Sequence, residues 1–150
     1  MIYSPSIFLF AFFTFSINAF SQSEVDFTPT EIYEMLGTTP SDCITKLKAQ
    51  GYEYSYSDGD NSVYEFNKTM LGLNFAPGSF AVNTIAYSTL DYTFLSNLRV
   101  LLLVGFYKTS GDDATQIWET DEGDKKIFIT ETKSEAGLTQ YNFAFKQVTN

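Results

Sequence analysis

Apolar residues recur at helical spacing in three segments of the chain, residues 28–36, 40–50 and 92–104. Thr39 and Pro40 form a typical helix start at the second segment, with an N-cap side chain followed by a proline in the first turn. Each segment is followed by a helix-ending glycine, namely Gly37, Gly51 and Gly105. The pattern therefore predicts three helices.

Alternating apolar and polar residues predict strands in most of the remaining chain. The expected strands are residues 52–57, 63–67, 71–76, 81–87, 106–109, 116–120, 126–132 and 140–148. Short turns rich in Asp, Asn, Gly and Ser separate many of them, which favours antiparallel pairing between neighbours. We expect an α+β fold in which the helices pack on one face of an antiparallel sheet of about eight strands. A closed barrel around a ligand fits less well, because residues 92–104 have the pattern of a core helix.

The order of a helix followed by strands occurs twice, in residues 28–89 and 90–150. A shift of 54 residues aligns Ile44, Leu47, Gly51 and Tyr52 with Leu98, Leu101, Gly105 and Phe106, Val63 to Glu65 with Ile117 to Glu119, and Leu73 and Phe75 with Ile127 and Ile129. Few of the aligned residues are identical. Two explanations stay open: an internal duplication that produced two tandem units, or a shared order of elements without common origin.

The N-terminal residues 1–21 have the character of a signal peptide. They contain no Asp, Glu, Lys or Arg, and the apolar run at residues 7–15 is too short to cross a bilayer. Ala19 and Ser21 occupy the two positions that a signal peptidase reads. The alternative, a buried segment or membrane anchor, is disfavoured because Ser16 and Asn18 interrupt the apolar run. We expect export to the periplasm or the medium and a single mature domain, residues 22–150, with no membrane insertion after cleavage.

Charge and composition exclude several classes of function. A net charge of −9 disfavours nucleic-acid binding and attraction to an anionic membrane surface. The chain has no histidine and one cysteine, Cys43, so histidine-dependent triads, histidine-ligated zinc and an internal disulfide are all excluded. Cys43 in a first helical turn is either a thiol of lowered pKa or a small packing residue, and the lack of a histidine base favours packing. We expect no enzyme, no cofactor and no metal.

Two weaker hypotheses rest on acidic residues. Glu65 and Glu119 occupy matching places in the two halves and suggest, as an alternative function, a carbohydrate-active hydrolase with paired carboxylates. Solvated strand positions explain these two glutamates more simply. The acidic turns offer oxygen ligands for calcium if they converge, although turn chemistry alone accounts for their composition. Their residues are Asp58, Asp60, Asn61, Asp112, Asp113, Asp121, Glu122 and Asp124.

Aromatic side chains are the most informative candidate surface feature. Strand alternation places Tyr52, Tyr54 and Tyr56 on one face and Tyr64 with Phe66 on one face of the next strand. The strands hold more large apolar residues than one buried face needs, so some are expected on the uncovered face, where Tyr and Trp suit recognition of a protein or glycan. The candidate contacts are Tyr54, Tyr56, Tyr64, Trp118 and Tyr141. The competing interpretation is that most of them are core residues.

This layout of residues 28–148, two successive helix-plus-strands units in an exported acidic chain, resembles the β-lactamase inhibitor protein family and small outer-membrane assembly lipoproteins. The resemblance implies a binding or inhibitory module. It concerns the order of elements only, because the chain lacks the disulfides of the first group and the lipobox cysteine of the second. No site residue is transferred from either group.

Overall fold

The computed structural model describes residues 27–75, 80–112 and 114–148. The expected signal peptide and its cleavage site lie outside these residues. The helices are α1 (Pro29–Met35), α2 (Pro40–Ala49) and α3 (Tyr92–Gly105). The strands are β1 (Glu53–Asp58), β2 (Asn61–Phe66), β3 (Thr69–Asn74), β4 (Thr84–Thr89), β5 (Tyr107–Gly111), β6 (Thr115–Glu119), β7 (Lys125–Lys133) and β8 (Thr139–Gln147). Each predicted helix and strand is present, with bounds that shift by a few residues.

All the strands form one antiparallel sheet in the order β1-β2-β3-β4-β8-β7-β6-β5. The first four strands and the last four are each a meander, and the two meanders meet where β4 pairs with β8. This arrangement confirms the predicted α+β class and the antiparallel sheet of eight strands. Strands β1 and β5 form the two open edges.

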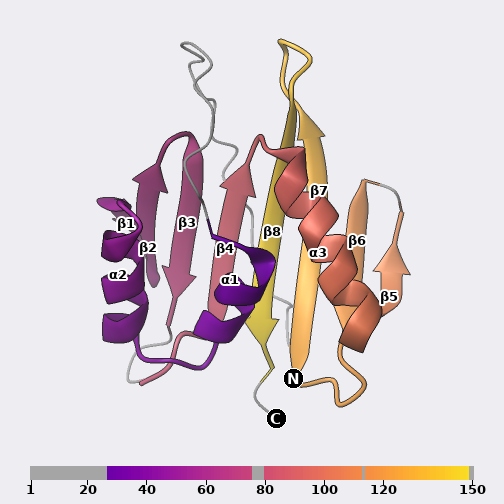
Figure 1. Ribbon diagram of the computed structural model, residues 1–150, viewed down its shortest axis with the longest axis horizontal. Helices are drawn as coiled ribbons and strands as arrows, with labels where there is room; N and C mark the ends of the chain where they lie inside the picture. The colour runs from indigo at the N-terminus through magenta and orange to yellow at the C-terminus, as the bar shows by residue number, and fades with distance from the viewer. Residues whose placement is uncertain (1–26, 76–79, 113, 149–150) are drawn as a thin grey trace, which may run out of the picture.

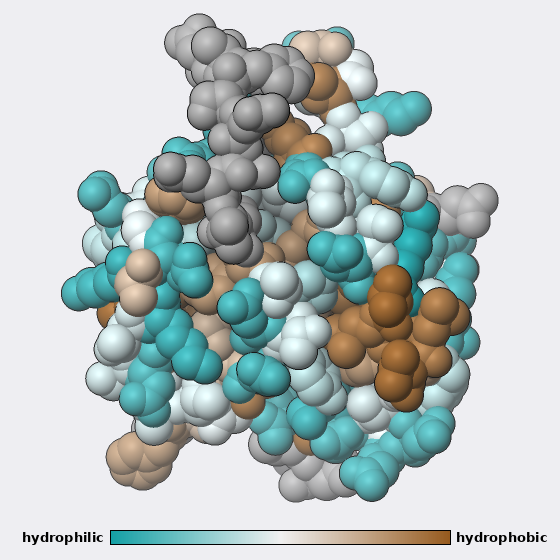
Figure 2. Space-filling view, in the orientation of Figure 1, coloured by the Kyte–Doolittle hydropathy of each residue, from teal (hydrophilic) through white to brown (hydrophobic). Residues whose placement is uncertain are grey.

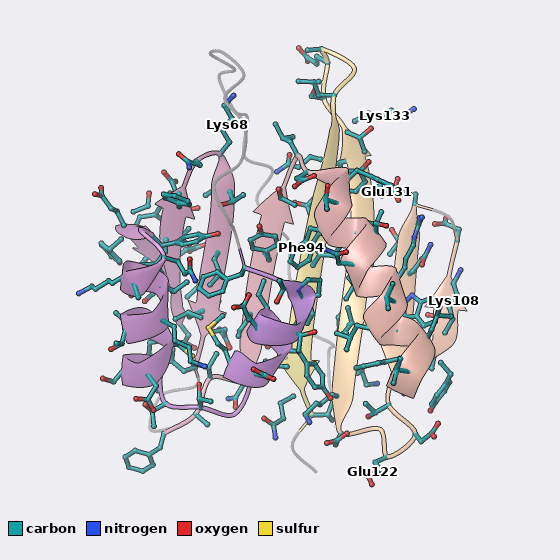
Figure 3. All side chains as sticks on the ribbon, in the orientation of Figure 1. Lys68, Phe94, Lys108, Glu122, Glu131 and Lys133 are labelled. Atoms are coloured by element: carbon teal, nitrogen blue, oxygen red, sulfur yellow. The ribbon has the colours of Figure 1, made fainter. Side chains whose placement is uncertain are left out.

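The helices lie on one side of the sheet, the near side in Figure 1, with α2 in front of β1 and β2, α1 near β4, and α3 crossing β8, β7 and β6. Their inward side chains join those of the strands in one apolar core. Phe94 of α3 illustrates the packing, because its ring lies 4.4 Å from that of Tyr87 and 4.8 Å from that of Phe143, centroid to centroid (Figure 3). Burial of such rings is the main favourable term in folding.

Side chains that accept hydrogen bonds from backbone N–H groups fix the N-terminal ends of the helices. Thr28 and Glu31 form a capping box at α1, in which each side chain accepts a hydrogen bond from the backbone N–H of the other residue. Thr39 caps α2 through the N–H of Asp42, and Asp91 caps α3 through the N–H of Thr93. Within the described residues, no helix combines the length and the apolar character needed to cross a bilayer.

Two hairpins at matching places in the halves differ in their turns. β2 and β3 are joined by Asn67 and Lys68, both at positive φ (45° and 70°), the combination that two-residue hairpins of type I′ require. The corresponding loop between β6 and β7 is longer and has Gly123 at positive φ. The alternation of the sequence does not reveal the Asn67–Lys68 turn, because it lacks the usual glycine.

Candidate binding face of the sheet

The structure separates the predicted aromatic contacts between the two faces of the sheet. Tyr64 pairs with the core residue Leu71 and is only 4 % exposed, so it lies under the helices. Trp118 and Tyr141 pack against the same core, Trp118 opposite Ile127. The expectation that these three side chains lie on an uncovered face is therefore corrected by the register: each shares its face with core residues of the neighbouring strands.

Tyr54 and Tyr56 lie on opposite faces because the pairing of β1 with β2 shifts between them. Tyr54 pairs with Tyr64 and remains on the helix side, at the edge, with 58 % of its surface exposed and its ring 5.8 Å from that of Tyr64. Tyr56 pairs with Val63 and faces away from the helices. A β-bulge adds one residue and reverses the alternation, so the prediction that Tyr52, Tyr54 and Tyr56 share one face was wrong. Whether the five aromatic residues bind a partner stays a prediction.

The face without helices carries a row of mainly apolar residues that crosses the whole sheet. Successive cross-strand partners form it from β1 to β5: Tyr56, Val63, Gly72, Ala86, Ala144, Phe128, Ile117 and Ser110. The three smallest side chains occupy the middle strands β3, β4 and β8, with bulkier residues on both sides. A partner can approach the sheet backbone most closely over Gly72, Ala86 and Ala144.

This row is separate from the helix-covered core. Val63 and Ala144 are buried although neither belongs to the core cluster, and Phe128 and Ile117 are half-buried. Among the described residues, no helix packs over this face (Figure 1). Only Ser110 of this row is exposed, so the contact area that the row offers comes mainly from the half-buried side chains of Tyr56, Ile117 and Phe128.

Polar side chains flank the row and bond to one another. On one side Ser88 donates to Asn142 (2.8 Å), and Gln140 donates to Ser88 (2.7 Å). On the other side Asn74 donates to Asn61 (2.9 Å). These bonds fix the amide and hydroxyl groups beside the apolar row. The face thus has an apolar centre and a polar rim, which is the usual anatomy of an interface.

Charged groups lie toward the two ends of this face. Glu119 forms an ion pair with Lys126 (2.6 Å), and Glu53 lies opposite Glu65 across β1 and β2. Burial, together with the nearby carboxylates of Asp58 and Glu65, raises the pKa of the Tyr56 phenol. Like an unperturbed tyrosine, Tyr56 is protonated at neutral pH and can donate a hydrogen bond.

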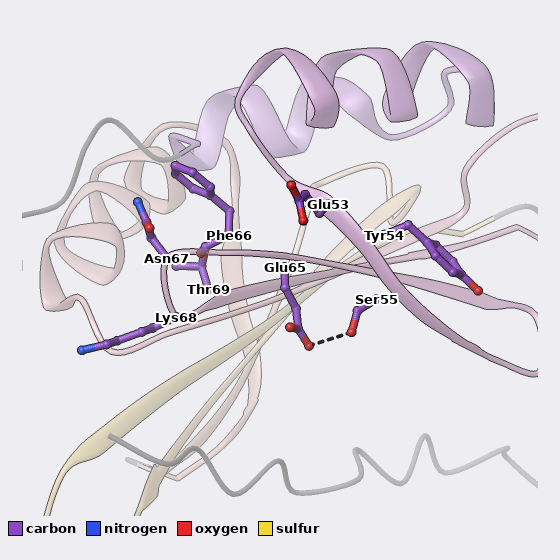
Figure 4. Close-up of a pocket in the computed structure, with 8 residues that line it drawn as sticks. All are labelled: Glu53, Tyr54, Ser55, Glu65, Phe66, Asn67, Lys68 and Thr69. Carbon is purple, nitrogen blue, oxygen red and sulfur yellow. Dashed lines mark hydrogen bonds between the residues drawn. The ribbon is translucent and has the colours of Figure 1, made fainter. Parts of the chain in front are cut away.

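A shallow hollow of about 310 Å³ opens beside the β1–β2 end (Figure 4). Its lining residues are Glu53, Tyr54, Ser55, Glu65, Phe66, Asn67, Lys68 and Thr69. Ser55 donates a hydrogen bond to Glu65 (2.9 Å), so that carboxylate has a structural partner. The hollow brings together one lysine and two glutamates at the sheet edge and does not include any residue of the apolar row.

The paired-carboxylate hypothesis is not supported by the sheet order. Four strands lie between β2, which carries Glu65, and β6, which carries Glu119. Adjacent strands are about 4.8 Å apart, so the two glutamates are separated by roughly 24 Å across the sheet. Glycosidase carboxylates lie about 5 to 10 Å apart. Glu65 and Glu119 of one chain therefore cannot flank the same glycosidic bond.

Cys43 and Asp112 have structural roles. Cys43 is fully buried, and desolvation raises the pKa of its thiol, as expected of a packing residue. Asp112 accepts hydrogen bonds from the backbone N–H groups of Ala114 and Thr115, which lower the pKa of its carboxyl. In the part of the chain that the structure describes, no three His, Cys, Asp or Glu side chains gather as a metal site would require. Asp113 lies outside that part.

Comparison of the chain with protein-family models, with curated proteins and with solved structures gives no match. The resemblance in layout to the β-lactamase inhibitor protein family stays a prediction.

The small residues in the middle of the row, Gly72, Ala86 and Ala144, were not predicted as part of a binding face, although their sequence context indicates it. In each of three strands a small residue stands between two large core residues: Leu71-Gly72-Leu73, Ile85-Ala86-Tyr87 and Phe143-Ala144-Phe145. Alternation predicts that the small residues share the face opposite the core. A search for aromatic side chains alone overlooks them.

Proposed function

We propose that the protein is an exported binding module that holds a protein or glycan partner on the helix-free face of its sheet, without catalysis. The observation that carries this proposal is the continuous row from Tyr56 to Ile117, with small residues over the central strands. Tyr56, Phe128 and Ile117 offer contact area on both sides of a low centre at Ala86 and Ala144. The flanking Ser, Asn and Gln side chains supply hydrogen-bond donors and acceptors to fix orientation.

We also propose that the two halves are duplicated units related by an approximate two-fold axis between Ala86 and Ala144. The β-bulges support this, because the register shifts between Tyr54 and Tyr56 and, 54 residues later, between Lys108 and Ser110. At the junction of the halves the two strands also match in composition, because Ala86 and Ala144 pair with each other and each stands between two large core residues, with Ile85 opposite Phe145 and Tyr87 opposite Phe143. On this alignment Leu71 and Leu73, rather than Leu73 and Phe75, correspond to Ile127 and Ile129.

Under such symmetry, each half of the chain contributes equivalent positions to the row. Val63 corresponds to Ile117 and Gly72 to Phe128, so the first half offers a small residue where the second offers a large ring. A partner that lies across the row meets two unequal sides. Duplication followed by divergence at Gly72 and Phe128 would create a surface selective for one orientation of its partner.

The binding proposal is tested by measuring affinity for a partner captured from the cell envelope or from a glycan array. Ala86→Lys places a long charged side chain at the centre of the row and is expected to weaken binding by at least about tenfold; Phe128→Ala removes a contact and is expected to do the same. Lys46→Ala on α2, which lies on the other side of the sheet, is the matched control. A dissociation constant that neither row variant changes, with both variants folded by circular dichroism, would contradict the proposal.

The export part is tested separately. Mass spectrometry of the protein recovered from the periplasm or medium of a bacterial host is expected to show Gln22 as the first residue. Recovery of an uncleaved chain from the cytoplasm would refute export while leaving the binding face untouched.

A further inference from the structure

The outward side of the C-terminal half of α3 is apolar and exposed. Val100, Leu103 and Val104 are 63 %, 82 % and 82 % exposed. They form the large hydrophobic patch at the right of Figure 2, over the C-terminal half of the helix. The inward side holds Phe94, Leu95, Leu98 and Leu102, so the C-terminal half of α3 is apolar on both sides, whereas the outward side of its first half is polar. A helix segment that is apolar on both sides is normally covered on both.

The patch lies next to an open edge of the sheet. Only Phe106 separates α3 from the edge strand β5, and all five residues of β5 are exposed. Lys108 marks this edge in Figure 3. An edge strand has backbone groups without a neighbouring strand, so it is a natural place for a second chain to lie alongside. Two incomplete surfaces, a helix face and a strand edge, therefore adjoin at this end of the molecule.

Charge distinguishes this end from the rest of the acidic chain. From Tyr92 to Gly111 there is no Asp or Glu, and Arg99 and Lys108 are the only charged residues, whereas the whole chain carries a net charge of −9. The opposite edge, β1, has Glu53 and Asp58 at its two ends. If two β1 strands lay antiparallel, these carboxylates would oppose each other. Two copies of this chain can approach at the β5 edge without that repulsion.

We propose that a second copy of this chain covers the α3 patch, around a two-fold axis perpendicular to the sheet at the β5 edge. This operation places the two β5 strands side by side and antiparallel, with α3 next to α3 on the same side of both sheets. The helix patch alone is on the order of a few hundred Å², less than the roughly 800 Å² that each partner usually contributes. The adjoining strand edge supplies further area.

The dimer has a consequence for the helix-free faces. A two-fold axis perpendicular to the sheet leaves both of these faces pointing in one direction, so a dimer would present two copies of the apolar row to a repeated or extended partner. Binding at two sites raises the effective affinity without new contacts. The dimer does not depend on the proposed function, because it involves the edge and the other face.

The test is the mass of the protein in solution, measured by light scattering after size-exclusion chromatography over a range of concentrations. The protein purified from the expression host, processed or not, is expected to form a particle of twice the monomer mass that dissociates on dilution. Leu103→Glu places like charges across the two-fold axis and is expected to weaken the dimer by at least about tenfold. Leu103→Lys should act likewise, because it removes the same apolar contact.

Ala49→Glu is the matched control, since Ala49 is exposed on α2 and lies 54 residues before Leu103. It should leave the dimer intact. A wild-type chain that stays monomeric at every concentration, or a dimer unaffected by both Leu103 substitutions, would overturn the proposal. A monomer that sediments with phosphatidylcholine or phosphatidylglycerol vesicles, and loses this behaviour in Leu103→Glu, would also overturn it by assigning the patch to a lipid surface.

Discussion

Helices α2 and α3 cover different parts of the same side of the sheet, and their inward faces are alike while their outward faces are not. Leu47 of α2 and Leu98 of α3 are both fully buried. With the 54-residue spacing, Lys46, Ala49 and Gln50 correspond to Val100, Leu103 and Val104. The inward residues must be apolar to form the core, but the outward residues are under no such demand. The apolar outward side of α3 therefore needs an explanation beyond the fold of one chain.

The sharpest contrast lies within α3 itself. Leu98→Ala is expected to lower the free energy of unfolding by about 3 kcal/mol, because it removes buried methyl groups and leaves a cavity in the apolar core. Leu103→Ala should change it by less than about 0.5 kcal/mol. Urea unfolding at low protein concentration measures both. Equal losses in the two variants would show that the outward side also stabilises the monomer.

The first hairpins of the two halves give the next largest contrast. Gly111 has a φ of 106°, and a Cβ there would collide with the carbonyl oxygen of Thr115. Gly111→Ala is expected to cost about 2 kcal/mol or more, through strain and displacement of the β5–β6 turn. Gly59 has a φ of 57° and open space around it, so Gly59→Ala should cost only about 1 kcal/mol. Thermal unfolding of both variants checks the difference. A smaller loss for Gly111→Ala would mean that the second half tolerates rearrangement of its edge hairpin.

Regular periodicity explains why the helices and strands were predictable. Residues 92–104 and strands such as β8 have strong apolar patterns, and capping residues such as Thr39 mark the ends. Departures from the period were not predictable. The bulge after Tyr54 reverses the faces of β1 without any Gly or Pro to mark it, so Tyr54 and Tyr56 were assigned to one face.

The pairing that joins the two meanders was also not predictable from the sequence. β4 and β8 pair although more than fifty residues separate them, and nothing local in either strand specifies that partner. The candidate site depends on this pairing, because it brings Ala86 beside Ala144 in the middle of the row. Sequence patterns identify which residues share a face of a strand, whereas the order of strands decides which faces become one surface.

The second hairpins of the two halves, β2–β3 and β6–β7, differ in the backbone conformation of their turns, and the expected effect on stability is smaller than for Gly111. Lys68 holds a φ of 70°, a conformation that side chains with a Cβ adopt at a penalty, whereas the β6–β7 loop uses Gly123 at 69°. Lys68→Gly creates the Asn-Gly pair favoured in type I′ turns and is expected to stabilise the protein by about 0.5 to 1 kcal/mol. The midpoint of urea unfolding should rise without a change in slope. A fall in the midpoint would show that contacts of the Lys68 side chain outweigh the backbone penalty.

The smallest expected change in stability is also the most direct test of the difference between α2 and α3. Replacing the outward residues of α3 by those of α2, with Val100→Lys, Leu103→Ala and Val104→Gln together, should alter the free energy of unfolding of the monomer by less than about 0.5 kcal/mol. The same variant should lose the dimer mass. The measurements must be made at low concentration, since dimerisation itself adds apparent stability.

The converse exchange, Lys46→Val, Ala49→Leu and Gln50→Val, gives α2 the outward side of α3. If an apolar helix face were sufficient for association, this variant would form larger assemblies. The acidic β1 edge beside α2 should instead oppose pairing, because Glu53 and Asp58 would face their counterparts. We therefore expect that the α2 exchange on its own adds little association. Strong association through α2 would show that the charge of the neighbouring edge is irrelevant and that hydrophobic area alone selects the interface.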